Sequence, residues 1–409
     1  MSSTYSKARS SSPSPLLSLI SEGGKLMLSD ATVNQELKKV NPYVISKQSV
    51  PTSLLQGSGY VDFELNSGQN IDLLRTVFAE ITVQSTSASS ITLVSPLMWL
   101  EFVSVMVNGS EVSGARYPPQ YMFDIINSVY STEELTSLAD AGNWSPTTFQ
   151  PANALGAGAT ATYRFPIFTF LDLCQVPLHP NIIYTLRFQF NGGPRLKVSG
   201  SGLVSEVNVT DFRLLLDGIC AHGQTKKALE AKLLSQPYLC RALLPGSYKP
   251  YDIGAMTAGS EYQILMTMYG KMAGFFVTLA DGATGAALQY TFAQLNRVDI
   301  RGADGQSYFL FDSGADNDVL LRKLLPVEQF TNPSIYRTLN LYPLIHSDSL
   351  EDNILDNSSH GSVRYNNVER IYIEPTGNVT AGVLWVYPLQ EHEITINYGK
   401  KSVVSNADC

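Results

Sequence analysis

The sequence predicts an all-β protein that uses one β architecture twice in succession. The chain holds 21 Tyr and 17 Phe beside 30 Gly and 21 Pro, a composition that favours strands joined by turns. Short alternating and apolar segments recur along the chain, which is typical of strands. Their order repeats as well, because segment 79–83 leads to 102–109 and segment 274–279 leads to 296–302.

The spacing of matched positions supports this internal repeat. Val277 lies 196 positions after Ile81, and Val298 lies 193 positions after Val105. Later segments of the second half also resemble segments of the first: 341–343 repeats 164–166, 370–373 repeats 186–189, and 383–387 repeats 212–216.

Length and composition limit the class of protein. At 409 residues the chain exceeds one ordinary hydrophobic core, so two domains are expected. Hydrophobic residues make up 44% and charged residues 16%, which allows large buried cores. The net charge of −8 gives no general attraction to nucleic acid, and we expect no sequence-specific nucleic-acid partner. We recognise no secretion signal and no segment near the roughly 20 apolar residues of a membrane helix, so synthesis in the cytoplasm is expected.

The first half divides into an arm and a β unit. Residues 1–42 begin with a Ser-rich stretch and carry a helical pattern interrupted by Gly23-Gly24, so this arm is expected to be partly disordered or helical. Residues 43–218 form the first unit, in which Asn108-Gly109 signals a tight turn. The predicted elements of this unit are strands at 60–65, 77–83, 91–94, 99–107, 163–170, 182–190 and 207–216 and a helix at 118–130.

The second half follows the same plan. Residues 219–236 are predicted to be a helical connector, because 225–234 is the best helix former in the chain. Residues 237–400 form the second unit, and residues 401–409 are expected to be a flexible C-terminal tail. The predicted elements of the second unit are strands at 239–244, 262–268, 274–279, 298–300, 308–311 and 394–398 and a helix at 318–325.

Roughly eight short strands per unit, with one helix inserted part-way, are typical of a jelly roll. A propeller requires four or more repeats, and an immunoglobulin-like pair lacks the inserted helix. The prediction is therefore two consecutive eight-stranded jelly rolls with short inserted helices and an N-terminal arm. Residues 132–162, rich in Gly, Ala, Ser and Pro, are expected to be a loop at an exposed end of the first roll.

The sequence lacks the motifs of catalysis. The five histidines are scattered, whereas a metal-dependent enzyme on a jelly roll needs clustered ligands. The Glu-His-Glu triplet at 391–393 places its neighbours on opposite faces of a strand, so it is interpreted as a solvated strand end. Asp312, Asp316 and Asp318 resemble part of a calcium loop, but the pattern is incomplete and a helix start is favoured. We expect no enzyme, no cofactor, and no catalytic, cofactor-binding or metal residues.

The repeated strand and helix segments of the two units resemble those of double jelly-roll major capsid proteins. This lineage includes the coat proteins of tailless icosahedral bacteriophages, adenovirus hexon and large eukaryotic DNA viruses. The resemblance covers about 43–400, and the compact loops are closer to those of phage coat proteins. The stretches that carry it are 74–108 with the helix at 118–130, 157–166 and 182–190, and their second-half counterparts 274–304, 318–325 and 370–387.

This resemblance implies a structural role in an icosahedral virion. Three chains would form a pseudo-hexagonal homotrimer that tiles the shell, with neighbouring capsomers and minor capsid or vertex proteins as partners. The N-terminal arm would lie beneath the shell, near an internal membrane where one exists. Synthesis would take place in the host cytoplasm.

One alternative function is a viral spike, or a carbohydrate- or receptor-binding double β-sandwich. Trp99 and Trp385 lie in apolar strands and are expected in cores, whereas Trp144 lies in a polar loop and is the candidate for stacking on a sugar. A metal-dependent enzyme on a jelly-roll scaffold is a third hypothesis, which the scattered histidines disfavour.

Overall fold

The computed structural model describes most of residues 37–312, the strand at 342–345, and most of residues 363–407. The longest internal gaps within these ranges are 191–205 and 282–292. The predicted helix at 318–325 and the first 36 residues of the predicted arm lie outside the described residues. In the described part, no helix has the length and apolar character needed to cross a membrane.

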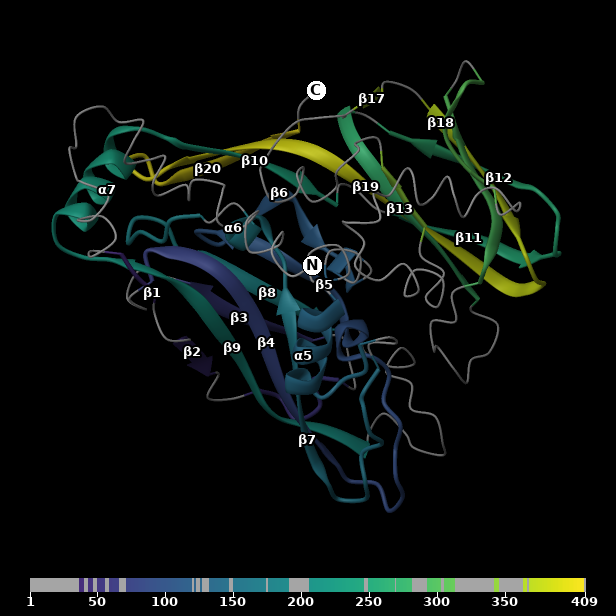
Figure 1. The fold of residues 1–409 in the computed structure, drawn as a ribbon, viewed down its shortest axis with the longest axis horizontal. Coiled ribbons are helices and arrows are strands. Elements are labelled where there is room, and N and C mark those ends of the chain that lie inside the picture. Colours follow the sequence, from purple (N-terminus) through teal and green to yellow (C-terminus); the bar gives the residue numbers. More distant parts are fainter. Residues whose placement is uncertain are drawn as a thin grey trace.

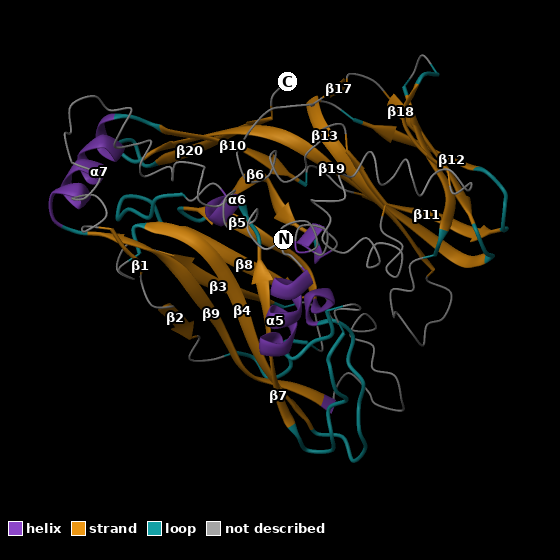
Figure 2. Ribbon diagram, viewed as in Figure 1, coloured by secondary structure: helices purple, strands orange, loops and turns teal. Residues whose placement is uncertain are grey.

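The first half folds into two antiparallel sheets that face each other (Figures 1 and 2). One edge of the five-stranded sheet is formed by two short strands, residues 37–39 and 43–46, which both pair with the long strand at 207–221. That sheet contains β1 (Leu37–Lys39), β2 (Tyr43–Ser46), β9 (Val207–Ala221), β4 (Leu73–Ser85) and β7 (Thr160–Ile167). The four-stranded sheet has the order β3 (Tyr60–Leu65), β8 (Tyr184–Phe190), β5 (Leu100–Val107) and β6 (Ser110–Tyr117).

The second half has the same strand order. Its larger sheet runs through β10 (Tyr238–Leu244) or β11 (Lys249–Met256), β19 (Val379–Asn397), β13 (Gly270–Asp281) and β16 (Tyr342–Ile345). Two further strands join it, β17 (Val363–Tyr365) beside β13 and β20 (Ser402–Ala407) beside β19. The smaller sheet has the order β12 (Tyr262–Thr267), β18 (Val368–Pro375), β14 (Leu295–Arg301) and β15 (Ser307–Asp312).

The register shows that the central strands of the two rolls pair at matched positions. Phe78 of β4 lies opposite Pro166 on one side and Leu215 on the other. Phe276 of β13 lies opposite Pro343 and Tyr387 in the same way. The predicted repeat is therefore confirmed, and the two rolls are equivalent in strand order and in pairing partners.

Even the irregularities of the sheets repeat. A β-bulge interrupts the pairing of β4 with β9 between Leu74 and Thr76, and one interrupts β13 with β19 between Met272 and Gly274. Both members of the second pair lie 198 positions after those of the first. This offset makes Leu279 the counterpart of Ile81, two residues from the position that the sequence matched. A shift of two residues leaves the alternation of a strand unchanged, so the pattern alone does not reveal it.

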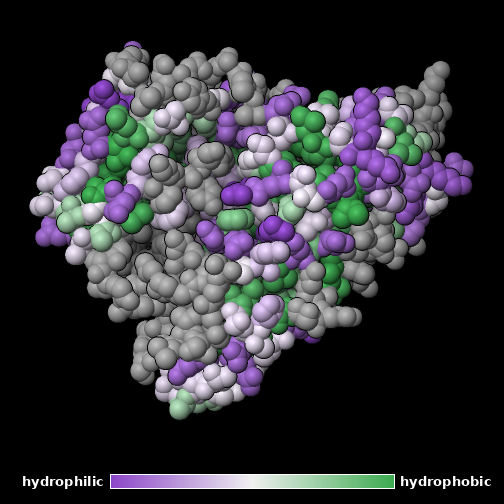
Figure 3. Space-filling model, turned by 180° about the vertical axis from the view of Figure 1, so that it is seen from behind, coloured by the Kyte–Doolittle hydropathy of each residue, from purple (hydrophilic) through white to green (hydrophobic). Residues whose placement is uncertain are grey.

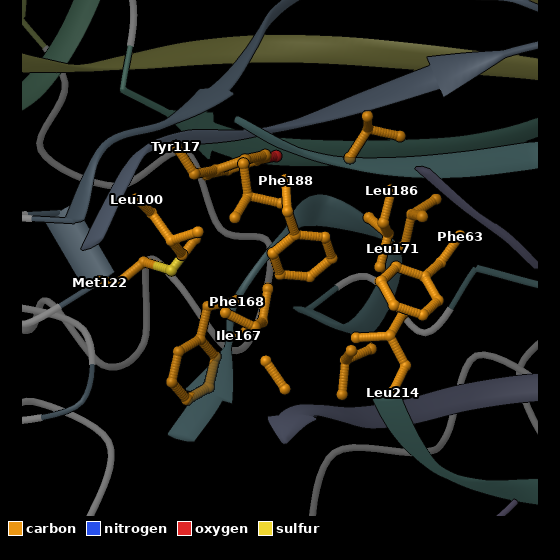
Figure 4. Packing of buried hydrophobic residues seen from close by; sticks show 14 of the residues in the cluster. Phe63, Leu100, Tyr117, Met122, Ile167, Phe168, Leu171, Leu186, Phe188 and Leu214 are labelled. Atoms are coloured by element: carbon orange, nitrogen blue, oxygen red, sulfur yellow. The ribbon is translucent and has the colours of Figure 1, made fainter. Parts of the chain in front are cut away.

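The core of the first roll lies between its two sheets. Figure 4 shows Phe63 and Phe188 converging with Leu186 and Leu214. Phe63 meets Phe188 and Phe212 edge to face, with ring centroids 5.7 and 5.0 Å apart. A second, separate cluster fills the second roll and includes Phe275, Val298 and Ile371. Each roll thus closes around apolar side chains that alternate inward along its strands.

The segment predicted as a connector contains the helix α7 (Gly223–Ser235), which buries Thr225, Leu229 and Leu233. Within the predicted helix at 118–130, the described residues 119, 121, 122 and 126 are helical. Tyr121, Met122 and Ile126 are fully buried there. Short helices also precede β5 (η2, Pro96–Trp99) and β8 (α6, Phe170–Leu173).

The predicted loop at 132–162 contains a helix, α5 (Thr132–Gly142). Glu133 and Glu134 occupy its first turn, where they interact favourably with the helix dipole, and Leu135 and Ala139 are buried. The helix packs against β7 on the outer side of the first roll, so tertiary contact stabilises a segment whose composition resembles a loop.

Trp144, expected to be exposed, is buried at 3% exposed area. Its indole Nε1 donates a hydrogen bond of 2.7 Å to the carbonyl oxygen of Arg164, on the strand next to α5. Trp144 has polar neighbours in the sequence, yet its indole is buried and anchors the segment after α5.

The predicted domain boundaries also differ from those of the structure. The flexible tail predicted at 401–409 is wrong for Ser402–Ala407, which form β20 beside β19. Strand β1 lies inside the predicted arm, and β9 extends beyond the predicted boundary at 218 to Ala221. These segments are short, and they become strands because a long neighbouring strand offers them hydrogen bonds.

Two aromatic residues of β3 provide a test of this core. Phe63 is fully buried, whereas Tyr60 is 57% exposed with Arg187 stacked on its ring. We expect Phe63→Ala to lower the free energy of unfolding by about 3–5 kcal/mol and Tyr60→Ala by less than about 1 kcal/mol. Chemical denaturation measures both, and equal losses would contradict the described facing of β3.

Candidate functional site: the seam between the two rolls

The second roll extends its larger sheet over the first roll. The first part of β19 pairs with β11 and β13 inside the second roll. The last part pairs with β10 on one side and β20 on the other. Figure 1 shows this three-stranded region above β6 and α6, and β10 and β20 contact β6 while β10 also contacts α6. We call this contact region, formed by β10, residues 390–398 and β20 against the first roll, the seam.

Strand β19 contributes to two cores, and its alternation shifts by one residue along its length. In its first part, Leu384 and Val386 face the second core, while Tyr387 and Leu389 belong to the cluster of the first roll. In its last part the even-numbered residues Ile394, Ile396 and Tyr398 face the first roll. The shift falls between Leu389 and His392, beside the bulge at Met272 and Gly274. One continuous strand therefore fixes the two rolls to each other.

Tyr398 is the main polar anchor of the seam. Its hydroxyl donates a 2.6 Å hydrogen bond to the carbonyl oxygen of Pro177 and lies 3.2 Å from the hydroxyl of Tyr184. The Tyr398 carbonyl oxygen accepts a 3.0 Å hydrogen bond from the side-chain amide of Asn181. Tyr398 is fully buried, so its hydroxyl and its carbonyl both find partners in the other roll.

Two tight turns meet at one end of the seam. Asn108, in the turn between β5 and β6, donates from Nδ2 to the carbonyl oxygen of Lys401 at 3.1 Å. Its Oδ1 accepts from the backbone N–H of Ile183, also at 3.1 Å. Asn108 and Lys401 both have positive φ, 47° and 57°, so each turn presents its polar groups from a left-handed conformation. The sequence identifies the Asn108-Gly109 turn but not its partner 293 positions later.

His392 lies inside the seam, between β10, β20 and β6. Its Nδ1 is 2.9 Å from the hydroxyl of Ser405, and that hydroxyl donates to the carbonyl oxygen of Ser113 at 3.1 Å. Because the Ser405 proton goes to Ser113, the imidazole Nδ1 is assigned a proton in this arrangement. Nε2 has no hydrogen-bond partner among the described residues, and burial lowers the pKa of His392 to about 4.

Gly114 makes room for this ring. A Cβ at position 114 would lie 2.8 Å from Cε1 of His392, closer than such atoms approach in proteins. Its φ of +77° also favours glycine. A side chain at position 114 would therefore push β6 away from β19.

The interpretation of 391–393 as a solvated strand end is wrong. Glu391 and His392 are each 3% exposed, and only Glu393 reaches solvent. The triplet lies within a 19-residue strand that has neighbours on both sides and the first roll beneath it. The three polar residues give no local signal of burial, because the strand that covers His392, β6, lies nearly 300 positions earlier in the sequence.

The carboxylate of Asp72 joins the first roll to the connector helix. Its Oδ2 accepts a 2.7 Å hydrogen bond from the backbone N–H of Ala221, where β9 ends, and its Oδ1 lies 3.2 Å from Nζ of Lys226 in α7. This contact fixes the direction in which α7 leaves the first roll. Within the described chain, no group of three or more His, Cys, Asp or Glu side chains is arranged to hold a metal ion.

The comparisons with known proteins come from solved structures. No protein-family model matches the chain, and no curated protein matches it. The crystal structure of PBCV-1 VP54, fitted into a cryo-EM reconstruction of the virophage Sputnik, matches with a TM-score of 0.62 at 12% identity, covering 91% of this chain and 96% of that one. The quasi-atomic model of the PBCV-1 virus capsid gives 0.60 at 12% identity with the same coverage.

The cryo-EM structure of the Sputnik virophage matches with a TM-score of 0.54 at 12% identity, covering 91% of this chain and 89% of that one. At such identities the likeness concerns the fold. Together with the two matching strand orders, it confirms the predicted double jelly roll, the fold of these major capsid proteins.

The burial of His392 makes the stability of the seam depend on pH. Its folded pKa of about 4 lies below the ordinary value of 6.5, so its contribution is fully present above pH 6.5 and is lost as the pH falls from 6.5 through 4. We expect His392→Gln to reduce the loss of unfolding free energy between pH 7 and pH 4 by up to about 3 kcal/mol. Denaturant titrations of both proteins at the two pH values measure this difference.

His222→Gln, which changes an exposed histidine at the start of α7, is the matched control and should leave the pH dependence as in the wild type. Asp172 acts in the opposite direction, because burial raises its pKa to about 7 and acid then favours the folded state. The pH dependence of the unfolding free energy is therefore compared between each variant and the wild type. Equal pH dependence in His392→Gln and wild type would contradict a buried neutral ring.

Proposed function

We propose that this chain is the major capsid protein of an icosahedral virus and that its role is structural, without catalysis. The observation that carries the proposal is the joining of two equivalent jelly rolls through a buried seam. Such a chain is a rigid block with two similar units, which suits the construction of a closed shell. The fold likeness to PBCV-1 VP54 and to the Sputnik structure supports the same function.

Three copies of such a block would form a pseudo-hexagonal homotrimer. Two similar units per chain give six similar units around a threefold axis, and the contacts between them are heterologous, so they repeat until the ring closes. Exposed large apolar residues occur on both rolls, and Figure 3 shows hydrophobic residues in several separate groups on one face. Several contact areas around the block are what a subunit surrounded by neighbours requires.

We infer further features of the virus from the resemblance to double jelly-roll capsid proteins. A tailless phage is favoured by the compact loops, while the structures matched above come from PBCV-1 and Sputnik. Minor capsid or vertex partners, contact of the arm with an internal membrane, and synthesis in the host cytoplasm belong to the same proposal.

The alternative of a carbohydrate- or receptor-binding protein loses its main support. Trp144, its candidate for sugar stacking, is buried and hydrogen-bonded. Trp99 is fully buried, and Trp385 is partly buried and stacked on Tyr387 with centroids 6.1 Å apart. The geometry therefore favours the capsid function over this alternative.

Light scattering coupled to size-exclusion chromatography tests the assembly. We expect the purified protein at micromolar concentration to elute with a mass three times the 44.7 kDa of the chain. Negative-stain images of the same fraction should show particles with a six-sided outline. A single species of 44.7 kDa at every concentration tested would contradict the proposed function.

A further inference from the structure

We propose that the outer face of the β2–β9–β4–β7 sheet in the first roll binds the second roll of another copy of this chain. The inference rests on the proposed homotrimer and identifies the residues of its subunit contact. It follows from the equivalence of the two rolls and from the way one of them is already covered within the chain.

A row of apolar side chains crosses this face. Val44 of β2 lies opposite Leu215 of β9, and Leu215 lies opposite Phe78 of β4. Val44 is 44% exposed, while Leu215 and Phe78 are partly exposed. We call these three residues the apolar row, and its exposure is unusual because β9 and β4, which carry Leu215 and Phe78, are central in the sheet.

A charged row lies beside the apolar row. Arg213 and Arg164 flank Glu80, which is their partner across β9 and β7 respectively. The two arginine side chains are 44% and 48% exposed, whereas the Glu80 side chain is 10% exposed. Apolar residues at the centre with charged residues at the margin are the arrangement of a protein interface.

The same row is buried within the chain in the second roll. Tyr387 is the counterpart of Leu215, because Phe276 and Phe78 pair with them in the same register. Tyr387 is fully buried and belongs to the cluster of the first roll. Trp385, the counterpart of Arg213, packs against that cluster too. In the second roll, this face packs against another roll. In the first roll, the equivalent face carries the apolar row and is uncovered.

A closed ring of alternating rolls repeats one kind of contact. Inside the chain, this face of the second roll meets the first roll on the side of β6. The next contact would then join this face of the first roll to the β15 side of a second roll in another copy, because β15 is the counterpart of β6 in strand order. Leu310 of β15 is 51% exposed and offers an apolar side chain for that contact.

The difference in chemistry between the two faces fits their different roles. The contact within the chain is buried and permanent, and it combines apolar side chains with hydrogen bonds, as in an obligate interface. The contact between chains carries Arg213, Glu80 and Arg164, and charged groups give an interface specificity and sensitivity to salt. Helix α5 packs on β7, so the β2–β9 side of the face is where the other copy would bind.

Val44→Arg tests this contact, because it places a charge in the apolar row at a position exposed enough to tolerate it in the monomer. We expect the concentration at which half of the trimer dissociates to rise by about tenfold or more, since an unpaired charge would be buried in the contact. Val404→Arg on β20 is the matched control, a valine of 48% exposure outside the proposed contact, and should assemble as the wild type.

Leu310→Arg alters the other side of the contact and should weaken the trimer as Val44→Arg does. Circular dichroism and thermal unfolding establish that each variant is folded. A folded wild type that stays monomeric would overturn the proposed function itself. A trimeric wild type whose Val44→Arg and Leu310→Arg variants assemble normally would overturn this inference and leave the proposed function standing.

Discussion

The structure depends on one long strand that serves two hydrophobic cores. The first part of β19 closes the second roll, and its last part covers the first roll through Ile394, Ile396 and Tyr398. Because backbone hydrogen bonds to β10 and β20 hold this strand on both sides, its direction cannot change without the loss of many bonds at once. The relative position of the two rolls is therefore set by main-chain geometry, and the side chains of the seam fill the space between them.

The two rolls share one strand framework but carry different residues on equivalent faces. Strand order, pairing partners and bulges repeat between the rolls, so both present similar outlines to a neighbour. The residues on equivalent faces differ, with Tyr387 and Trp385 in one roll where Leu215 and Arg213 stand in the other. One architecture thus supports a permanent contact within the chain and, in the proposed trimer, a separable contact between chains.

Local pattern was enough to predict the repeat, the class of fold and several elements. The alternation of residues 60–65 corresponds to the burial of β3, and Asn108-Gly109 forms the expected turn with positive φ at both residues. The failures share a cause. Trp144, His392 and the segment 402–407 each take their structure from a neighbouring element outside their own segment, namely β7, β6 and β19. Single-sequence periodicity reports which face of a strand is apolar and gives no information about what covers its polar face.

The measurement that tests this account most directly is a cryo-EM reconstruction of the purified assembly. The account predicts six jelly rolls around a threefold axis, alternating first roll and second roll, with β10, β19 and β20 joining the two rolls of each chain. It also predicts a second roll of the neighbouring chain on the face that carries Val44 and Leu215. A reconstruction in which the two rolls of one chain separate, or in which they do not alternate around the axis, would contradict it.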